Sequence, residues 1–120
     1  MWRFTKQLLS NQLIAIVAYF LYLTFKYRYI GPQTRLPTLT GFIVELLFHA
    51  FVGEMAFYYS HRLLHHPSIY KYIHKRHHEY PSPIALGAIY CHPIEHILSN
   101  ILPVAVGPIV MHSHNLMMYA

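Results

Sequence analysis

Six histidines fall within eighteen residues, in two groups separated by a short linker. They are His61, His65 and His66, then His74, His77 and His78. Imidazole is a common protein ligand for iron, zinc and copper, and its neutral ring offers a lone pair near neutral pH. Residues three and four apart share a helix face, so each group can aim its rings at one point. The spacing predicts a metal site. The alternative, a solvated basic loop, suits the apolar and aromatic flanks poorly.

Carboxylates lie close to both histidine groups. Glu54 and Tyr58 share one predicted helical stripe with His61 and His65, at spacings of four, three and four residues. Glu54 could therefore lie below a metal or pair with a neighbouring helix, and both interpretations stay open. Glu79 follows the second group and could hydrogen-bond a ligating ring or form a surface ion pair with its i−4 neighbour, a lysine.

Further histidines lie towards the carboxyl end. His92 and His96 are four residues apart. They could add two metal ligands, support other ligands, or be buried hydrogen-bonded side chains. His112 and His114 are predicted to be surface residues.

The composition indicates a membrane protein of one domain. The chain has 120 residues, of which 55% are hydrophobic and only 11% charged, whereas soluble domains average about 25% charged residues. The single cysteine, Cys91, excludes an internal disulfide and is predicted to be a small buried filler. The net charge is +5, with basic residues at the ends of apolar runs and around the histidines. That arrangement suits lipid headgroups and argues against nucleic-acid binding.

Three apolar runs predict an all-α fold, an integral membrane helical bundle with His-rich cytosolic helices. They cover residues 8–25, 39–59 and 84–111, and a span needs about 20 residues. The first run is marginal, and a cleaved signal peptide is the competing interpretation. Prolines and glycines predict that the third run is one span, kinked or preceded by a re-entrant segment. We expect an N-terminal membrane-associated helix and loop over 1–38 and a domain over 39–120, which contains both histidine groups.

Prolines also mark where the histidine-bearing helices should begin and end. Pro67 is expected to stop the helix that carries the first group. Ser68 is expected to cap a new helix that starts at Ile69 and carries the second group. Pro81 and Pro83 would end that helix, so that two helices meet at a tight corner.

The distribution of basic residues predicts the orientation in the membrane. Four lysines or arginines surround the histidines, and none follows Arg76. The histidines should therefore face the cytosol and the end of the third run the lumen. Arg28 and Arg35 then fall on the wrong side, unless the first run lies in the interface instead of crossing.

The segments around the histidines resemble a known family. Residues 58–67 read YYSHRLLHHP, residues 70–79 read YKYIHKRHHE, and residues 88–95 read AIYCHPIE. Together they resemble the fatty acid hydroxylase/sterol desaturase superfamily. They are most similar to its C4-methylsterol oxidase-like branch and to fatty acid hydroxylase domain-containing proteins. The resemblance extends over about residues 40–111.

The resemblance implies an enzyme of the endoplasmic reticulum membrane with two non-haem irons. It implies O2-dependent hydroxylation or desaturation of a membrane lipid or sterol, with electrons from NAD(P)H through a cytochrome b5-type partner. His61 with His65 or His66 matches the first histidine box of the family, and the helical argument favours His65. The second box is matched by His74, His77 and His78. No catalytic residue beyond these ligands is predicted, although Glu54 and Tyr58 are expected to line the approach to them.

The family pattern continues with another His-x-x-His-His box, and this sequence stops at Ala120 before reaching one. We therefore expect an incomplete fragment or isoform that binds metal weakly and has no hydroxylase activity alone. Two alternatives come from other classes of function. One is a non-catalytic membrane protein acting as a regulator or decoy, and the other is a segment of a zinc transporter. A transporter should carry paired ionisable residues at mid-membrane depth in several spans.

Overall fold

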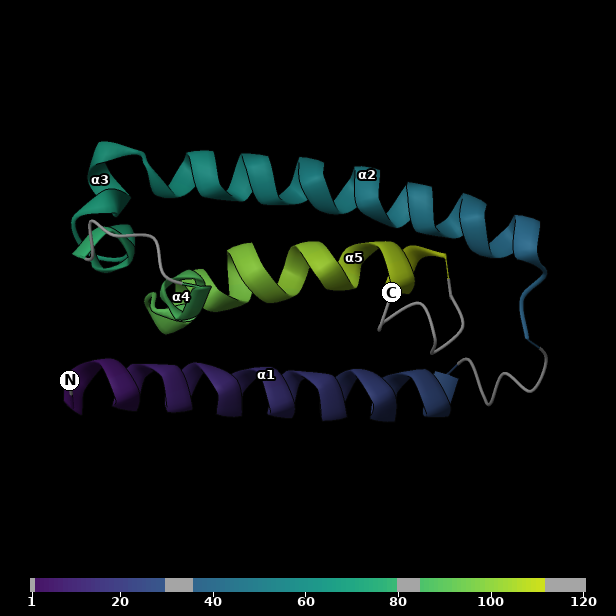
Figure 1. Cartoon of the computed structure of the whole chain (residues 1–120), viewed down its shortest axis with the longest axis horizontal. Coiled ribbons are helices and arrows are strands. Elements are labelled where there is room, and N and C mark those ends of the chain that lie inside the picture. Colours follow the sequence, from purple (N-terminus) through teal and green to yellow (C-terminus); the bar gives the residue numbers. More distant parts are fainter. Residues whose placement is uncertain (1, 30–35, 80–84, 112–120) are drawn as a thin grey trace.

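The structure is a computed structural model, and it describes residues 2–29, 36–79 and 85–111. Three long helical stretches dominate it: α1 (Trp2–Tyr29), α2 (Leu39–Leu64) and the stretch Pro93–Val110. Within these described ranges there are helices and turns and no strand, which confirms the predicted all-α fold. α1 and α2 run in opposite directions on the two sides of the molecule, and α5 (Leu102–Val110) lies between them (Figure 1).

All three long stretches are long and apolar enough to cross a membrane. α1 has 28 residues and α2 has 26. At about 1.5 Å per residue, each exceeds the roughly 30 Å hydrocarbon core of a bilayer. Their ends can therefore project into the headgroup region or beyond it.

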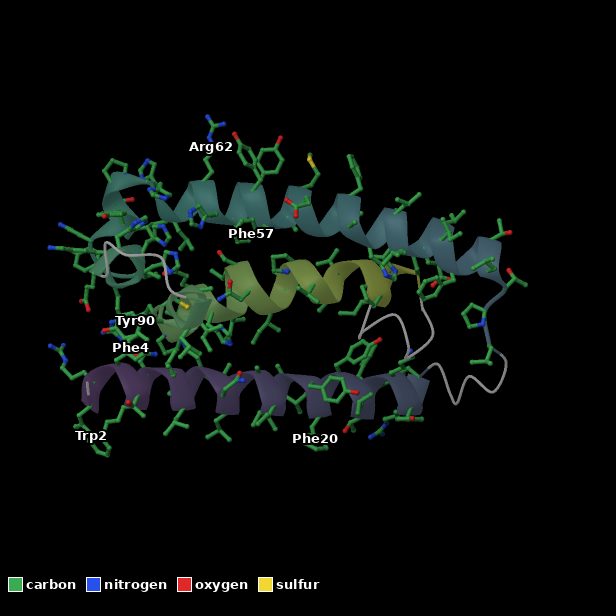
Figure 2. All side chains as sticks on the ribbon, viewed as in Figure 1. Trp2, Phe4, Phe20, Phe57, Arg62 and Tyr90 are labelled. Atoms are coloured by element: carbon green, nitrogen blue, oxygen red, sulfur yellow. The ribbon has the colours of Figure 1, made fainter. Side chains whose placement is uncertain are left out.

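The distribution of side chains is the reverse of that in a soluble domain. Only 6% of the most apolar window of α1 is buried, and none of that of α2. Trp2 and Phe20, for example, project away from the other helices (Figure 2). The buried side chains are mostly polar: Asn11, Lys26, His74, Glu95, His96 and Ser99. Apolar groups outside and polar groups inside are what a lipid environment favours.

α1 is tied to the rest of the bundle by its amino-terminal half. The Asn11 side chain is fully buried and donates hydrogen bonds to the carbonyl oxygens of Ile89 (2.7 Å) and Cys91 (3.0 Å). The Phe4 ring stacks on the Tyr90 ring, with centroids 4.9 Å apart. These contacts favour a helix retained in the folded protein over a cleaved signal segment. The division into 1–38 and 39–120 stays a prediction.

The third span is interrupted, as the sequence predicts. It begins with the single turn α4 (Pro93–Glu95), widens into the π-helical segment η3 (His96–Ile101) and continues as α5. The Leu102 N–H bonds to the Ile97 carbonyl, five residues back. Pro103 follows at once, and because it has no N–H, the regular ladder cannot form at that point. The interruption is thus a local widening of the helix.

The corner between the two histidine groups differs from the prediction. α2 ends at Leu64, and α3 (Pro67–Tyr70) is only four residues long. His66, and not Ser68, is its N-cap, because the His66 ring accepts from the Ser68 N–H at 3.4 Å. Pro67 fits the first helical position, where a missing N–H has no consequence.

The second histidine group lies on a tighter helix than expected. After a turn, residues His74–Glu79 form the 3-10 helix η1. A second 3-10 helix, η2 (Ala85–Ile89), leads into the third span. Pro81 and Pro83 lie outside the described residues, so the predicted end of this helix is not tested.

Candidate metal centre

The first histidine group sits on the last turns of α2. His61 and His65 are one turn apart, and their Nε2 atoms lie 3.3 Å from each other. The regular α-helix alone produces this approach, because residues i and i+4 lie above one another. The predicted projection of these two rings from one face is confirmed.

The second group meets the first through His74. The Nε2 atom of His74 lies 3.1 Å from that of His65 and 3.0 Å from that of His78. Four Nε2 atoms therefore follow one another in the order 61, 65, 74, 78. The ligand atoms of His61, His65 and His74 all lie within 4.8 Å of one another. Both groups occupy the same end of the molecule, beside α3 (Figure 1).

These separations fit a shared metal ion. A metal–imidazole bond of about 2.0–2.1 Å places neighbouring ligand nitrogens roughly 3.0–3.4 Å apart. The three measured Nε2 separations fall in that range. All-nitrogen ligation suits iron, copper and zinc, and not calcium or magnesium.

His77 extends the cluster. Its ring centroid lies 5.5 Å from that of His74 and 5.4 Å from that of His78. Its Nδ1 atom is buried and has no hydrogen-bond partner among the described residues. A buried polar atom without a partner is unfavourable, so this nitrogen is a candidate ligand or hydrogen-bond donor. We call the five residues His61, His65, His74, His77 and His78 the histidine cluster.

Two rings of the cluster, those of His74 and His78, have a lowered pKa. Burial, together with the neighbouring imidazoles of His61 and His65, lowers the pKa of His74 to about 3. The pKa of His78 is also lowered, first by burial and then by His77 and His65. A neutral imidazole has a free lone pair, so both rings are ready to bind a cation near pH 7.

Three further histidines, His66, His92 and His96, form local hydrogen bonds. The His66 Nδ1 atom lies 2.7 Å from the Ser68 hydroxyl, as part of the N-cap of α3. His92 caps α4 by accepting from the Ile94 N–H at 3.2 Å. His96 is buried and pairs with Asn100 at 3.1 Å. His112 and His114 lie outside the described residues.

The carboxylates near the cluster divide into two roles. Glu79 accepts a hydrogen bond from the Tyr90 hydroxyl at 2.8 Å. That bond holds η1 against residue 90 and is neither of the two contacts expected for Glu79. Glu54 and Tyr58 line a hollow of about 400 Å³ together with His61 and His65, and their predicted role on the approach to a metal stays a prediction.

The site also contains a carboxylate without a predicted role. Glu95 Oε1 lies 2.8 Å from His74 Nδ1, and both side chains are buried. The two residues are 21 positions apart, so helical spacing cannot reveal the pair. The only signal in the sequence is that Glu95 closes the segment 88–95, which carries part of the family resemblance.

Comparison with known proteins supports the family that the sequence motifs resemble. The fatty acid hydroxylase family matches residues 46–120. The chain belongs to this family. The match begins inside α2 and includes both histidine groups and the Glu95 segment, so the site just described lies wholly within the family's domain.

Three relatives show the range of the family. Human fatty acid hydroxylase domain-containing protein 2 is 56% identical over 82 residues, which are 68% of this chain and 25% of the relative. A methylsterol monooxygenase-like protein of Dictyostelium discoideum is 38% identical over 66% of this chain and 29% of its own length. Very-long-chain aldehyde decarbonylase GL1-11 of Oryza sativa subsp. indica is 33% identical over 78% of this chain and 35% of its own length. No solved structure matches the chain.

The chain spans about a quarter of the length of the human relative it matches. The names of the three relatives describe a family of oxidases of lipid metabolism. They also name different reactions, so the shared histidine region does not by itself define the substrate.

A groove lies along the membrane-spanning part of this family domain. It has a volume of about 460 Å³ and lies between α2 and the third span. Its walls include Leu46, Ala50, Pro103 and Val104. Glu54 and Phe57 line both this groove and the hollow beside His61. The two spaces therefore adjoin.

Proposed function

We propose that this chain carries part of the iron site of a membrane-bound lipid oxidoreductase with a non-haem diiron centre. The observation that carries the proposal is a row of four Nε2 atoms from two separate elements, each 3.0–3.3 Å from the next, of which those of His61, His65 and His74 lie within 4.8 Å of one another. The histidine cluster would hold the metal. Iron in an all-histidine site supplies the capacity to use O2 to oxidise an unactivated C–H bond.

The chain's own side chains would bring a lipid to that site. The groove offers apolar walls at membrane depth, and Phe57 links it to the hollow beside His61. An acyl chain or a sterol could enter from the bilayer and present one carbon to the cluster. The same walls exclude water, which protects a reactive centre from side reactions. Fatty acids and sterols remain alternative substrates.

Ligand number supports a partial site. Two six-coordinate irons take roughly eight to ten protein ligands when few waters are bound. The histidine cluster supplies five. We therefore propose that further ligands come from residues outside the cluster, and that the chain alone binds metal weakly and oxidises no lipid.

The charge distribution supports the cytosolic orientation that we propose for the histidines, and the family resemblance supports an endoplasmic reticulum location. Lys26 and Arg28 lie at the far end of α1. The other described basic residues lie at the histidine end: Arg3, Lys6, Arg62, Lys71, Lys75 and Arg76. This bias follows the positive-inside rule and places Arg3 and Lys6 with the cytosolic group. A basic rim also suits an acidic electron carrier, so electrons from NAD(P)H would arrive through a cytochrome b5-type partner.

Anaerobic Fe²⁺ titration of the purified 120-residue chain in lipid nanodiscs tests the proposal. We expect weak binding of Fe²⁺ that is lost in His65→Ala and His74→Ala. His66→Ala is the matched control and should bind as the unaltered chain does, because the His66 ring belongs to the α3 cap. Fe²⁺ binding that is unchanged in both variants would contradict the proposal, and so would two tightly held irons in the unaltered chain.

Lipid analysis separates the enzyme from a non-catalytic membrane protein. Deletion of the encoding gene should raise one lipid and deplete its oxidised product. A gene carrying His65→Ala should reproduce that change at normal protein levels. An unchanged lipid profile in both strains would favour a regulator or decoy instead.

A further inference from the structure

We propose that Glu95 is the positioning residue that fixes the orientation and tautomer of His74. The inference rests on the proposed function in one respect, that His74 is a metal ligand. Glu95 Oε1 lies 2.8 Å from His74 Nδ1, the ring nitrogen on the side opposite Nε2. In the arrangement that we propose, the carboxylate accepts this hydrogen bond and Nδ1 carries the proton. The lone pair of Nε2 is then directed at His65 and His78.

The pair is built into the core of the site. His74 is fully buried and Glu95 is only 3% exposed. The other carboxylate oxygen of Glu95, Oε2, is buried without a hydrogen-bond partner in the described residues. Burying a carboxyl group with one unsatisfied oxygen is unfavourable. A role confined to packing would be served as well by an apolar side chain, so the unfavourable burial argues for a specific function.

Position within the cluster makes His74 the ring that needs such control. Its Nε2 atom contacts both His65, on α2, and His78, on η1. A wrong tautomer at His74 would present an N–H to the metal and separate the two groups. The short helix η1 offers little local rigidity, so a side chain from α4 supplies the constraint.

Glu95 is itself held by neighbouring elements. It forms the last residue of α4, a single turn that His92 caps and Pro93 begins. The preceding backbone, at Ile89 and Cys91, accepts hydrogen bonds from Asn11 of α1. The carboxylate therefore projects from a turn whose start is capped and whose preceding backbone is held by α1. Outer hydrogen-bond partners of this kind typically contribute about 10- to 100-fold to metal affinity.

Nitrogen-15 NMR of the histidine rings in the metal-free 120-residue chain tests the tautomer directly. In the unaltered chain, His74 should be protonated at Nδ1 and unprotonated at Nε2. Glu95→Gln keeps the size of the side chain but lets it donate as well as accept, so His74 should become a mixture of tautomers. Glu95→Asp keeps the acceptor and should largely restore the single tautomer. Glu79→Gln is the matched control, because the amide oxygen can still accept the hydrogen bond from the Tyr90 hydroxyl, and it should leave His74 unchanged.

Cobalt titration supplies the second measurement, since the d–d absorption of Co²⁺ reports the number and arrangement of its ligands. We expect Glu95→Gln to weaken Co²⁺ binding about 10- to 100-fold and to alter that absorption, with the melting temperature of the metal-free chain unchanged. Protonation of His74 at Nε2 in the unaltered chain would overturn the proposal. So would a Glu95→Gln chain that melts earlier yet keeps the original tautomer, because that pattern marks a structural role only. Neither result depends on iron or on activity, so the proposed function is tested separately.

Discussion

The two histidine groups reach the same point by different means. His61 and His65 stand one turn apart on a 26-residue α-helix, and the helix alone brings their Nε2 atoms together. His74 and His78 stand on a six-residue 3-10 helix with no long element behind it. Side chains from distant segments hold that helix in place. The first group is therefore encoded locally and the second by tertiary contacts.

Those tertiary contacts come from both neighbouring spans. Glu95 of α4 bonds to His74, and Tyr90 bonds to Glu79 at the end of η1. From α1, Gln7 accepts a hydrogen bond from Arg76 at 2.7 Å. Loss of a tertiary contact should therefore disturb the second group and leave the first group intact. We expect the loss of metal binding to be largest for His74→Ala and absent for Gly107→Ala.

His74→Ala should have the largest effect. His74 is the ring that joins the two groups, with Nε2 atoms on either side at 3.1 and 3.0 Å. We expect Co²⁺ affinity to fall by at least about 100-fold, the upper end of what even an outer-shell loss produces. His61→Ala removes a ring from the end of the series and should weaken binding less. Calorimetric titration in nanodiscs measures both, and equal losses would mean that His74 has no special position.

The same contrast explains how far the sequence could predict the site. Helical periodicity identified the shared face of His61 and His65, and apolar run length identified the three spans. Helical periodicity did not identify the N-cap of α3 at the corner between the two histidine groups. The choice between His66 and Ser68 as cap depends on a side-chain hydrogen bond. Periodicity also could not pair Glu95 with His74, because that contact joins residues 21 apart through the fold. Period-based reasoning works where one helix supplies the geometry and fails where two elements must meet.

Asn11→Leu should weaken the second group from a distance. The substitution removes hydrogen bonds to the Ile89 and Cys91 carbonyls and the partner of Gln7. Leaving buried carbonyl groups unpaired costs about 1–3 kcal/mol of stability. The backbone before Glu95 would also loosen, so we expect several-fold weaker Co²⁺ binding together with a lower melting temperature.

Gln12→Leu is the control for that experiment, since Gln12 lies next to Asn11 on α1 and is exposed. It should change neither the melting temperature nor Co²⁺ binding. Should Asn11→Leu behave as this control does, the hydrogen bonds of Asn11 would have no part in supporting η1. The contact of Gln7 with Arg76 would then be the remaining support from α1 among those described here.

Gly107→Ala should lower the stability of the helical bundle without changing the affinity for metal. A Cβ atom at Gly107 would lie 2.7 Å from the His49 ring and 3.1 Å from its Cα, where α5 crosses α2. Overpacking of this kind typically costs about 1–3 kcal/mol, offset in part by the roughly 1 kcal/mol gain of alanine over glycine in a helix. The melting temperature should fall, with Co²⁺ affinity of the folded chain unchanged.

Gly53→Ala is its matched partner, because a Cβ atom there would meet the Pro103 carbonyl oxygen at 3.4 Å, an ordinary contact. It should be neutral or slightly stabilising in the same melting experiment. Weaker Co²⁺ binding in Gly107→Ala alone would show that the crossing of α2 and α5 sets the position of His61 and His65. The first group would then depend on tertiary packing as the second does, and the difference between the two groups would disappear.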